Sequence, residues 1–282
     1  MDVTPIHERP RLPRRATAGH KGTYGTVLVV AGSRGMSGAA VLCGRAALRG
    51  GAGLVQVACP ADVQPAVATA YPGYTTFGFG ADNPGEVLGL ARGADVLAIG
   101  PGLGREPSTV AFVRRVLGGL TQTPVLLDAD GLFAVSPFAD EFRRTAPFVL
   151  TPHPGEFARL TGGAAPATDA ERQERAVAFA HTFGCVLLLK GSGTLVTDGE
   201  RLYRNATGNP GMATGGSGDV LSGVIAALIG QGLSAFDAAV LGAWVHGRAG
   251  DLGAAVLGQT ALTAPDLLDS LPAAFRELES HW

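Results

Sequence analysis

The sequence has few charged residues, few cysteines and no long apolar run, and each shortage argues against a class of protein. Charged residues make up 16% of the 282 positions and the formal net charge is −2, so no nucleic-acid or membrane partner is indicated. Three widely separated cysteines, Cys43, Cys59 and Cys185, argue against a disulfide framework and fit a reducing cytoplasm. Glycine or charge interrupts every apolar segment before it reaches the length of a membrane span. We therefore expect a soluble cytoplasmic protein.

Several motifs of familiar enzymes are also absent. The chain has no GxxxxGK[ST] phosphate loop and no GxGxxG after a predicted strand, which argues against a P-loop or a Rossmann dinucleotide site. A GxSxG nucleophile elbow is missing, because Ser217 is followed two positions later by an acid and not by glycine. Neither HExxH nor a paired Cys/His spacing typical of zinc occurs.

Apolar and glycine-rich segments alternate along the chain in a pattern typical of an α/β protein. Hydrophobic residues make up 46% of the sequence, and the 42 glycines gather at the ends of apolar runs. The predicted strands are 26–31, 54–58, 96–99, 125–127, 148–150 and 186–189, and a hairpin is predicted over 194–204. The predicted helices are 38–49, 108–117, 169–183, 219–229, 235–252 and 264–278. This alternation predicts a mostly parallel central sheet with helices on both faces.

A polar or glycine-rich loop follows most of the predicted strands. LVVA leads into GSRGMSG, VLAI into GPGLG, VLL into DADG, FVL into TPHPGE and VLLL into KGSGT. The carboxyl ends of parallel strands share one edge of a sheet, where the ligands of open α/β folds bind. We therefore expect these five loops to line one cleft, together with GGSGD at the start of a helix.

The segment NPGMATGGSGDVLSGVIAALIG, residues 209–230, joins a flexible loop to a regular helix. Its glycines leave backbone N–H groups bare, and a helix N-terminus attracts anions through unpaired donors and a partial positive charge. Asp219 lies in this loop, where an aspartate also serves as an ordinary helix cap. An acid inside an anion site suits phosphoryl transfer, in which donors hold the phosphoryl group and a carboxylate accepts a hydroxyl proton.

The first twenty residues differ in composition from the rest. They carry several arginines but no apolar stretch behind a charged start, so they do not have the pattern of a signal peptide. We expect a solvated arm or leader over 1–20. A single domain is expected over 21–282, because no repeat, low-complexity tract or proline-rich linker divides it.

The ordered set of motifs resembles a known family. GGSGD before an apolar helix is similar to the anion hole and catalytic base of the ribokinase-like fold, a three-layer α/β/α architecture. The resemblance to the ADP-dependent NAD(P)H-hydrate dehydratases is carried, in this order, by HKGTYGTVLVVAGS, MSGAAVL, AIGPGLG, LLDADGL, LTPHPGE, LLLKGSGT and NPGMATGGSGD. It extends from about residue 21 to the C-terminal helices, and TPHPGE together with NPGMATGGSGD is its most specific part.

The resemblance implies an activity in the repair of nicotinamide cofactors. NADHX and NADPHX carry a hydroxyl at C6 of the reduced ring, and phosphorylation by ADP with Mg²⁺ would make it a good leaving group. Its elimination would give NADH or NADPH, with release of AMP and phosphate. The resemblance also implies a homotetramer. Many relatives have a preceding epimerase domain, which we do not expect here, so a separate epimerase would be the partner enzyme.

The resemblance further implies roles for individual residues. Asp219 would contact the substrate hydroxyl and act as the base. The phosphoryl group would be held by the amides of Gly215, Gly216, Ser217 and Gly218. Adenine-nucleotide contacts are implied for Lys190, Gly191, Ser192, Gly193, Thr194 and Gly218. Contacts to the hydrated dinucleotide are implied for Ala39, Gly102, His153 and Asp219.

Simpler roles stay open for three of these segments. KGSGT on its own is typical of an ordinary turn between strands. His153, between two prolines, fits a surface turn residue. Ala39 fits a packing contact between a helix and the sheet, although small residues also let a large ligand approach the backbone.

Four further polar residues have two interpretations. Glu156 corresponds to an acid that helps to organise Mg²⁺ in ribokinase-like enzymes, but it also fits a first-turn acid that stabilises a helix dipole. No direct metal ligand is assigned. Asp128 and Asp130 follow a strand at the expected edge of the sheet, yet both also fit turn caps. His246 is expected in the core or in an interface.

Two other functions compete with the dehydratase. A small-molecule kinase of the same fold, acting on a vitamin precursor, would share GGSGD, although the pair TPHPGE and GPGLG argues against it. A nucleotide-binding sensor without catalysis would have no need of the base Asp219.

Overall fold

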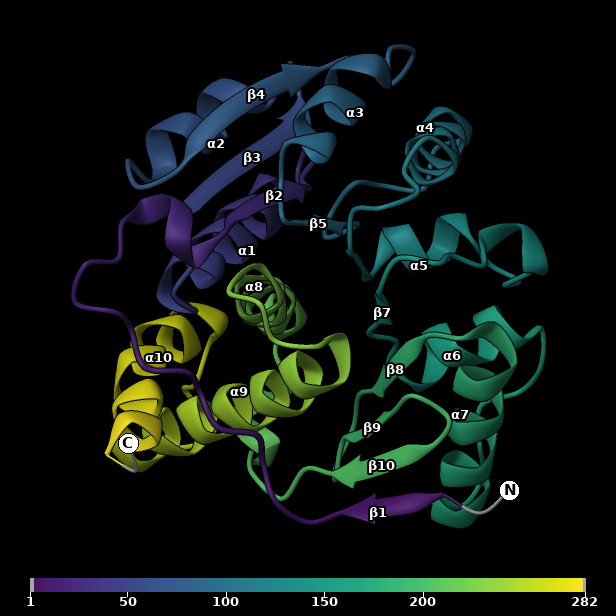
Figure 1. Cartoon of the computed structure of the whole chain (residues 1–282), viewed down its shortest axis with the longest axis vertical. Coiled ribbons are helices and arrows are strands. Elements are labelled where there is room, and N and C mark those ends of the chain that lie inside the picture. Colours follow the sequence, from purple (N-terminus) through teal and green to yellow (C-terminus); the bar gives the residue numbers. More distant parts are fainter. Residues whose placement is uncertain (1–2, 281–282) are drawn as a thin grey trace.

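The computed structural model describes residues 3–280 and contains a ten-stranded sheet between two layers of helices (Figure 1). The strands are β1 (Thr4–Ile6), β2 (Thr26–Val30), β3 (Leu54–Pro60), β4 (Thr75–Phe79), β5 (Val96–Ile99), β6 (Val125–Leu127), β7 (Phe148–Leu150), β8 (Val186–Leu189), β9 (Leu195–Thr197) and β10 (Arg201–Arg204). Their order in the sheet is β1-β10-β9-β8-β7-β6-β5-β2-β3-β4. All neighbours are parallel except the pairs that β9 forms with β8 and β10. The predicted hairpin is therefore confirmed as β9 and β10.

Helices cover both faces of this sheet. They are α1 (Ser37–Arg49), α2 (Gln64–Ala70), α3 (Gly85–Arg92), α4 (Pro107–Gly118), α5 (Asp130–Ala134), α6 (Pro154–Thr161), α7 (Asp169–Phe183), α8 (Ser217–Gly230), α9 (Ala235–Leu257) and α10 (Ala264–Glu279). Three short 3₁₀ turns are η1 (Lys21–Tyr24), η2 (Asp140–Phe142) and η3 (Pro210–Met212). One face carries α1, α2 and α8 to α10, and the other carries α3 to α7.

The apolar pattern of the strands explains the three layers. In β2, Val27 and Val29 belong to the core shared with α1, α8, α9 and α10, whereas Leu28 and Val30 belong to the core shared with α3 to α7. Successive side chains of a strand point to opposite faces, so a strand covered on both sides is apolar at every position. The predicted three-layer α/β/α architecture is therefore confirmed.

Helix α8 lies near the centre of the molecule and is firmly held there (Figure 1). Eleven of its fourteen residues are buried, including every residue from Val220 to Ile229. Gly223 lets α1 pass very close, since a Cβ at this position would lie 2.2 Å from the Cys43 carbonyl oxygen. A helix packed on all sides cannot shift easily, so the position of its N-terminus is fixed.

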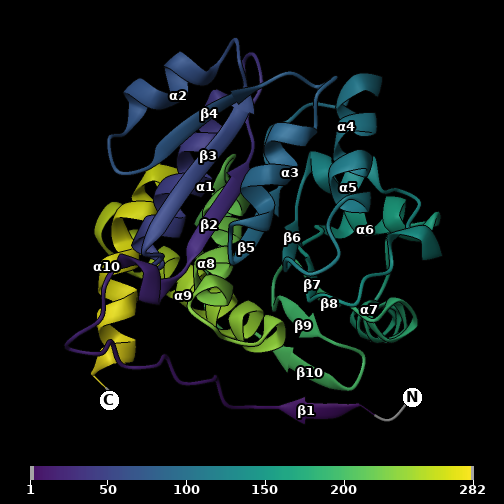
Figure 2. The same ribbon diagram turned by 45° about the horizontal axis from the view of Figure 1, so that its top comes forward.

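The N-terminal segment contacts the domain at several of its described residues. Thr4–Ile6 form β1 and pair with β10 at one end of the sheet, opposite the edge strand β4 (Figure 2). Ile6 and Leu12 pack against the core, and the Arg9 guanidinium lies 4.2 Å from the Trp244 ring centroid. Most of residues 3–20 are exposed, whereas Ile6, Arg9 and Leu12 are half-buried against the domain. The division into an arm and one domain stays a prediction.

A membrane-spanning helix needs about 20 consecutive, mostly apolar residues. Within residues 3–280, no helix combines the necessary length and apolarity. Even α9, the longest helix at 23 residues, has charged and glycine positions inside it.

Candidate active site

The start of α8 provides bare backbone donors. Gly216 precedes the helix with φ 88°, a left-handed conformation that favours glycine, and a Cβ there would lie 2.6 Å from Leu42 Cδ1. The first N–H groups of a helix have no acceptor within the helix. Of the amides expected to hold an anion, that of Ser217 already donates to the Thr214 carbonyl at 3.4 Å. The amides of Gly218 and Asp219 follow it in the first turn and lie beside the expected cleft.

A buried network of charges surrounds this helix start. The Lys190 ammonium lies 2.8 Å from Asp128 Oδ1 and 3.6 Å from Glu156 Oε2. The second oxygen of Asp128 accepts a hydrogen bond from the Ser222 hydroxyl at 2.8 Å. A Cβ at Gly218 would lie 3.4 Å from Lys190 Nζ, so the ammonium stands directly beside the first turn of α8. Loops that follow β6, β7 and β8 are thereby joined to α8, as the predicted single cleft requires.

The carboxyl group of Asp219 has a raised pKa. Burial raises the pKa of this carboxyl to about 7, and repulsion from Asp128 and Asp130 acts in the same direction. The Lys190 ammonium partly offsets both effects. A carboxylate with a pKa near the working pH is suited to accept a proton and release it again. Burial acts to lower the pKa of Lys190, but the carboxylates of Asp128 and Glu156 outweigh it, so the ammonium stays charged.

The raised pKa of Asp219 predicts the pH dependence of any reaction in which this carboxylate accepts a proton. Because its pKa is raised to about 7, this group is largely protonated in mildly acidic solution and unable to accept a proton. We expect kcat/KM to rise about tenfold per pH unit on the acidic side and to level off above the pKa. Initial rates across a pH series at saturating nucleotide measure this. A profile without an acidic limb would contradict the role of Asp219 as the base.

His153 and Glu156 form the start of α6. The Nδ1 atom of His153 accepts hydrogen bonds from the amides of Gly155 at 3.0 Å and Glu156 at 3.3 Å, and Glu156 Oε2 accepts one from the His153 amide at 2.7 Å. This reciprocal capping box confirms Glu156 as a first-turn acid. The imidazole is half exposed, and its Nε2 lies 3.5 Å from Glu156 Oε1.

Asp128 and Asp130 have different surroundings although only Ala129 separates them. Ala129 has φ 49°, which is rare for a residue other than glycine, and it turns the two carboxylates in different directions. Asp130 accepts hydrogen bonds from the Gly104 amide at 2.9 Å and from Arg105 Nε at 2.8 Å. Asp130 therefore anchors the GPGLG loop, whereas Asp128 belongs to the network around Lys190.

The segment 190–194 connects β8 to β9 as a turn. Gly191 and Gly193 have φ values of 142° and 59°. Arg172 on α7 donates to the carbonyl oxygens of Ser192 at 3.1 Å and Gly193 at 3.2 Å. These two hydrogen bonds hold the turn against α7. The simpler interpretation as a strand-to-strand turn is confirmed. Contact with a nucleotide stays a prediction.

Ala39 in the first turn of α1 lies against Gly102 in the loop that follows β5. A Cβ at Gly102, where φ is 61°, would be 2.8 Å from Ala39 Cβ. The Ser33 hydroxyl donates to the Gly102 carbonyl at 2.8 Å, which joins the loops after β2 and β5. Both residues thus have a packing role, and both are only partly buried.

His246 on α9 is buried and contacts the start of α8. Its Nε2 atom lies 2.9 Å from the Ser217 carbonyl oxygen and 3.2 Å from the Ser217 hydroxyl. Burial lowers the pKa of His246 to about 4, so the ring is neutral near pH 7 and donates from Nε2. The expected core location is confirmed. The contact with Ser217 was not predicted from the sequence.

We expect His246→Phe to affect both stability and turnover. The Ser217 carbonyl and hydroxyl would lose a buried partner, which costs about 1–3 kcal/mol in the free energy of unfolding. Since the same contact positions the start of α8, we expect kcat to fall about tenfold. Urea denaturation and steady-state rates measure the two effects, with the exposed His181→Phe on α7 as the matched control. An unchanged kcat would assign His246 to the core alone.

The sequence did not single out Ser222 or the pairing of Lys190 with Asp128. Ser222 interrupts the apolar face of α8 three residues after Asp219, and residues at this spacing lie on the same side of a helix. A lone hydroxyl on a buried face is the signal that was available. Within residues 3–280, no group of three or more His, Cys, Asp and Glu side chains is arranged to hold a metal ion.

The fold and the site together define the class of the protein. A mostly parallel sheet, a buried helix that begins at glycines, and a carboxylate in its first turn are the features of a ribokinase-like α/β enzyme. The family model described as NAD(P)H-hydrate dehydratase matches residues 27–273. The chain belongs to this family.

Individual relatives agree with the family. The chain is 47% identical to the bifunctional NAD(P)H-hydrate repair enzyme of Moorella thermoacetica over 96% of its own length and 53% of the relative. It is 39% identical to the ADP-dependent (S)-NAD(P)H-hydrate dehydratase of Xanthomonas campestris, with 92% and 93% of the two chains covered. The chain thus spans about half the length of the bifunctional relatives.

A solved structure is similar as well. The ADP/ATP-dependent NAD(P)H-hydrate dehydratase of Bacillus subtilis, co-crystallised with ATP and Mg²⁺, superimposes with a TM-score of 0.85 at 33% identity and covers 95% of each chain. These relatives are dehydratases, so a plain vitamin-precursor kinase is not favoured. The assignment to a dehydratase family of carbon–oxygen lyases that bind nucleotides is confirmed.

Proposed function

We propose that this chain dehydrates NADHX and NADPHX to NADH and NADPH at the expense of ADP. One observation carries the proposal: the Asp219 carboxylate, with its raised pKa, lies in the first turn of α8 beside bare amides and the Lys190 ammonium. The relatives named as ADP-dependent dehydratases support the choice of reaction. ADP is the proposed phosphoryl donor, and ATP is an alternative donor, as the name of the Bacillus subtilis protein indicates.

In the first stage a phosphoryl group passes from ADP to the substrate. Asp219 accepts the proton of the C6 hydroxyl while the hydroxyl oxygen forms a bond to the β-phosphorus of ADP, and AMP leaves. The amides of Gly218 and Asp219 and the Lys190 ammonium would hold the negative oxygens of the moving group. Donors fixed in a buried helix need no reorganisation as the charge develops, because α8 is packed on all sides.

In the second stage the phosphorylated substrate loses phosphate. The lone pair of the ring nitrogen forms a double bond as the C6–O bond breaks, and loss of a proton restores the dihydronicotinamide ring. The sum is one hydrated cofactor and one ADP converted to one reduced cofactor, one AMP and one phosphate. Once Asp219 is protonated and neutral, it no longer repels the departing phosphate.

The residues of the site also fit a divalent cation. Asp128 and Glu156 present two buried carboxylates near the start of α8, and oxygen ligands of this kind, together with phosphate, are what Mg²⁺ prefers. These two side chains would hold Mg²⁺, directly or through water, and the ion would neutralise phosphate charge. The proposal further includes a cytoplasmic location, a homotetramer and cooperation with a separate epimerase, for which the family resemblance is the support.

A single assay tests the proposed reaction. The full chain is incubated with NADHX, ADP and Mg²⁺, and the absorbance of reduced nicotinamide is followed while AMP and phosphate are quantified. We expect NADH, AMP and phosphate in equal amounts. A stable phosphorylated product without NADH would instead indicate a kinase, and nucleotide binding without turnover would indicate a sensor. Parallel reactions with ATP establish the preferred donor.

A further inference from the structure

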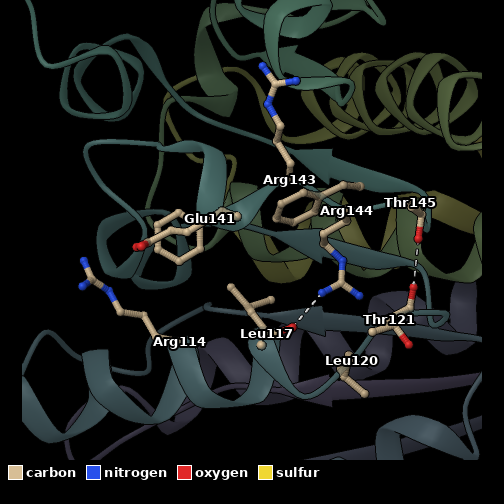
Figure 3. Close-up of a pocket in the computed structure, with 11 residues that line it drawn as sticks. Arg114, Leu117, Leu120, Thr121, Glu141, Arg143, Arg144 and Thr145 are labelled. Carbon is tan, nitrogen blue, oxygen red and sulfur yellow. Dashed lines mark hydrogen bonds between the residues drawn. The ribbon is translucent and has the colours of Figure 1, made fainter.

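A cavity lies at the amino ends of β6 and β7, whereas the candidate active site lies at their carboxyl ends. The cavity has a volume of about 490 Å³ and is bounded by the end of α4, by η2 and by the segments that lead into β6 and β7 (Figure 3). Thr121 precedes β6, and Phe148 begins β7. The active-site residues Asp128 and His153 follow the other ends of these two strands. A volume of this size is sufficient for a small organic ligand.

The Arg144 guanidinium in this cavity has no counter-ion. Its Nη1 donates to the Leu117 carbonyl at 2.9 Å and its Nη2 to the Thr123 carbonyl at 3.3 Å, whereas its Nε is buried without any partner. Within residues 3–280 no carboxylate forms an ion pair with Arg144. Burial lowers the pKa of Arg144, with no opposing carboxylate. A half-buried guanidinium without a counter-ion is costly, and an anion that reached it would lower this cost.

Three further charged residues, Arg114, Glu141 and Arg143, line the cavity. Arg143 lies 2.7 Å from Asp140, and Figure 3 shows its guanidinium turned away from Arg144. The Glu141 carboxylate lies on the side of Arg114 and at a distance from Arg144 (Figure 3). Arg143 is paired with Asp140 and one acid, Glu141, lines the cavity, so Arg144 leaves a positive charge without an ion-pair partner among the described residues. A single positive charge matches a monoanion better than a dianion.

The other residues that line the cavity indicate which chemical groups a ligand would carry besides its charge. Thr121 and Thr145 lie beside Arg144, with the Thr145 hydroxyl 3.5 Å from the Thr121 carbonyl oxygen (Figure 3). Leu117, Leu120 and Phe148 supply apolar surface, and the Arg144 guanidinium lies 5.8 Å from the Phe148 ring centroid. A planar carboxylate pairs well with the planar fork of an arginine.

We propose that this cavity binds a small organic carboxylate, with the carboxylate on Arg144 and the threonines and an apolar body on Leu117, Leu120 and Phe148. The site is separate from the proposed catalytic centre, and the proposal does not depend on the function of that centre. Charge, hydrogen-bond donors and apolar walls converge at one place, as in other small-molecule sites.

Benzoate is the probe, and benzyl alcohol is its neutral counterpart. Calorimetric titration of the full chain is expected to show benzoate binding at least about tenfold more tightly than benzyl alcohol, since a hydrogen-bonded charge contributes that much. Arg144→Gln is expected to remove this difference. Arg143→Gln, whose guanidinium faces away, is the matched control and is expected to bind benzoate like the wild type.

A second variant tests benzoate binding in the cavity if Arg144→Gln does not fold. Thr121 is exposed at the cavity, so Thr121→Trp is expected to fold, to fill the space and to abolish benzoate binding. Equal affinity for benzoate and benzyl alcohol would overturn the proposal. So would benzoate binding that survives in Thr121→Trp or in folded Arg144→Gln. Tighter binding of inorganic phosphate than of benzoate would contradict the assignment to an organic carboxylate.

Discussion

Asp219→Asn is expected to lower kcat about a thousandfold, because the amide cannot accept the hydroxyl proton that a general base removes. The substitution keeps the size and shape of the side chain in the first turn of α8, so the binding of ADP is expected to change little. Steady-state assays with NADHX and ADP, together with equilibrium titration of ADP, separate the two effects. Turnover within about tenfold of the wild type would remove Asp219 from the chemistry.

The stability of the same variant provides an independent check. The pKa of Asp219 is raised to about 7 in the folded protein, above the ordinary value of about 4. A raised carboxyl pKa means that stability is lost as the pH rises from the ordinary value to the folded value. Asparagine has no charge, so we expect Asp219→Asn to be at least as stable as the wild type above neutral pH. The exposed Asp269→Asn on α10 is the control and should change neither activity nor this pH dependence.

Gly218→Ala is expected to fold normally and to lose about a hundredfold or more in kcat/KM. The added methyl would lie 3.4 Å from Lys190 Nζ and 3.6 Å from Asp128 Oδ2, which are ordinary van der Waals distances. The backbone of Gly218 does not have the left-handed conformation that would exclude alanine. The Cβ of a helical residue points toward the N-terminus. The methyl would therefore occupy the space between the helix start and Lys190 that the phosphoryl group is proposed to use. Steady-state kinetics with varied ADP measures the loss.

Gly89→Ala is the matched control for this substitution. Gly89 lies inside α3, where a Cβ would meet nothing within 4 Å. Alanine is the better helix former by about 1 kcal/mol, so the control should gain slightly in stability and keep its activity. Equal activity of Gly218→Ala and Gly89→Ala would contradict the placement of the phosphoryl group.

Much of the central fold is predictable because buried parallel strands are apolar at every position. The ranges 96–99, 125–127, 148–150 and 186–189 were predicted with the bounds observed for β5 to β8. Helix α7 also has the predicted bounds, since Thr168 caps its start and Gly184 ends it in a left-handed conformation. Local signals and burial agree in these elements.

Elements at the periphery were not predicted, for physical reasons. β4 is an edge strand, and Thr75 and Phe77 in it are exposed, so its sequence lacks a continuous apolar run. β1 has three residues and contains Pro5, which is tolerated only because the strand lies at an edge. The start of α6 could have been predicted, since Pro154 at the first position and Glu156 at the third are helix-start signals.

The location of the site was predictable from strand order, but its internal contacts were not. Polar loops after parallel strands must share an edge, and this places Asp128, His153 and Lys190 together. Which of them form ion pairs depends on side-chain geometry across 62 positions of sequence, as for Lys190 with Asp128. The raised pKa of Asp219 follows from that packing and therefore could not be predicted from its neighbours in the chain.

A crystal structure of the chain with ADP and Mg²⁺ tests the central claim most directly. We expect the β-phosphate oxygens within hydrogen-bonding distance of the Gly218 and Asp219 amides and of Lys190 Nζ, with the adenosine along residues 190–194. ADP bound away from the start of α8, with Asp219 untouched by any phosphate, would contradict the account.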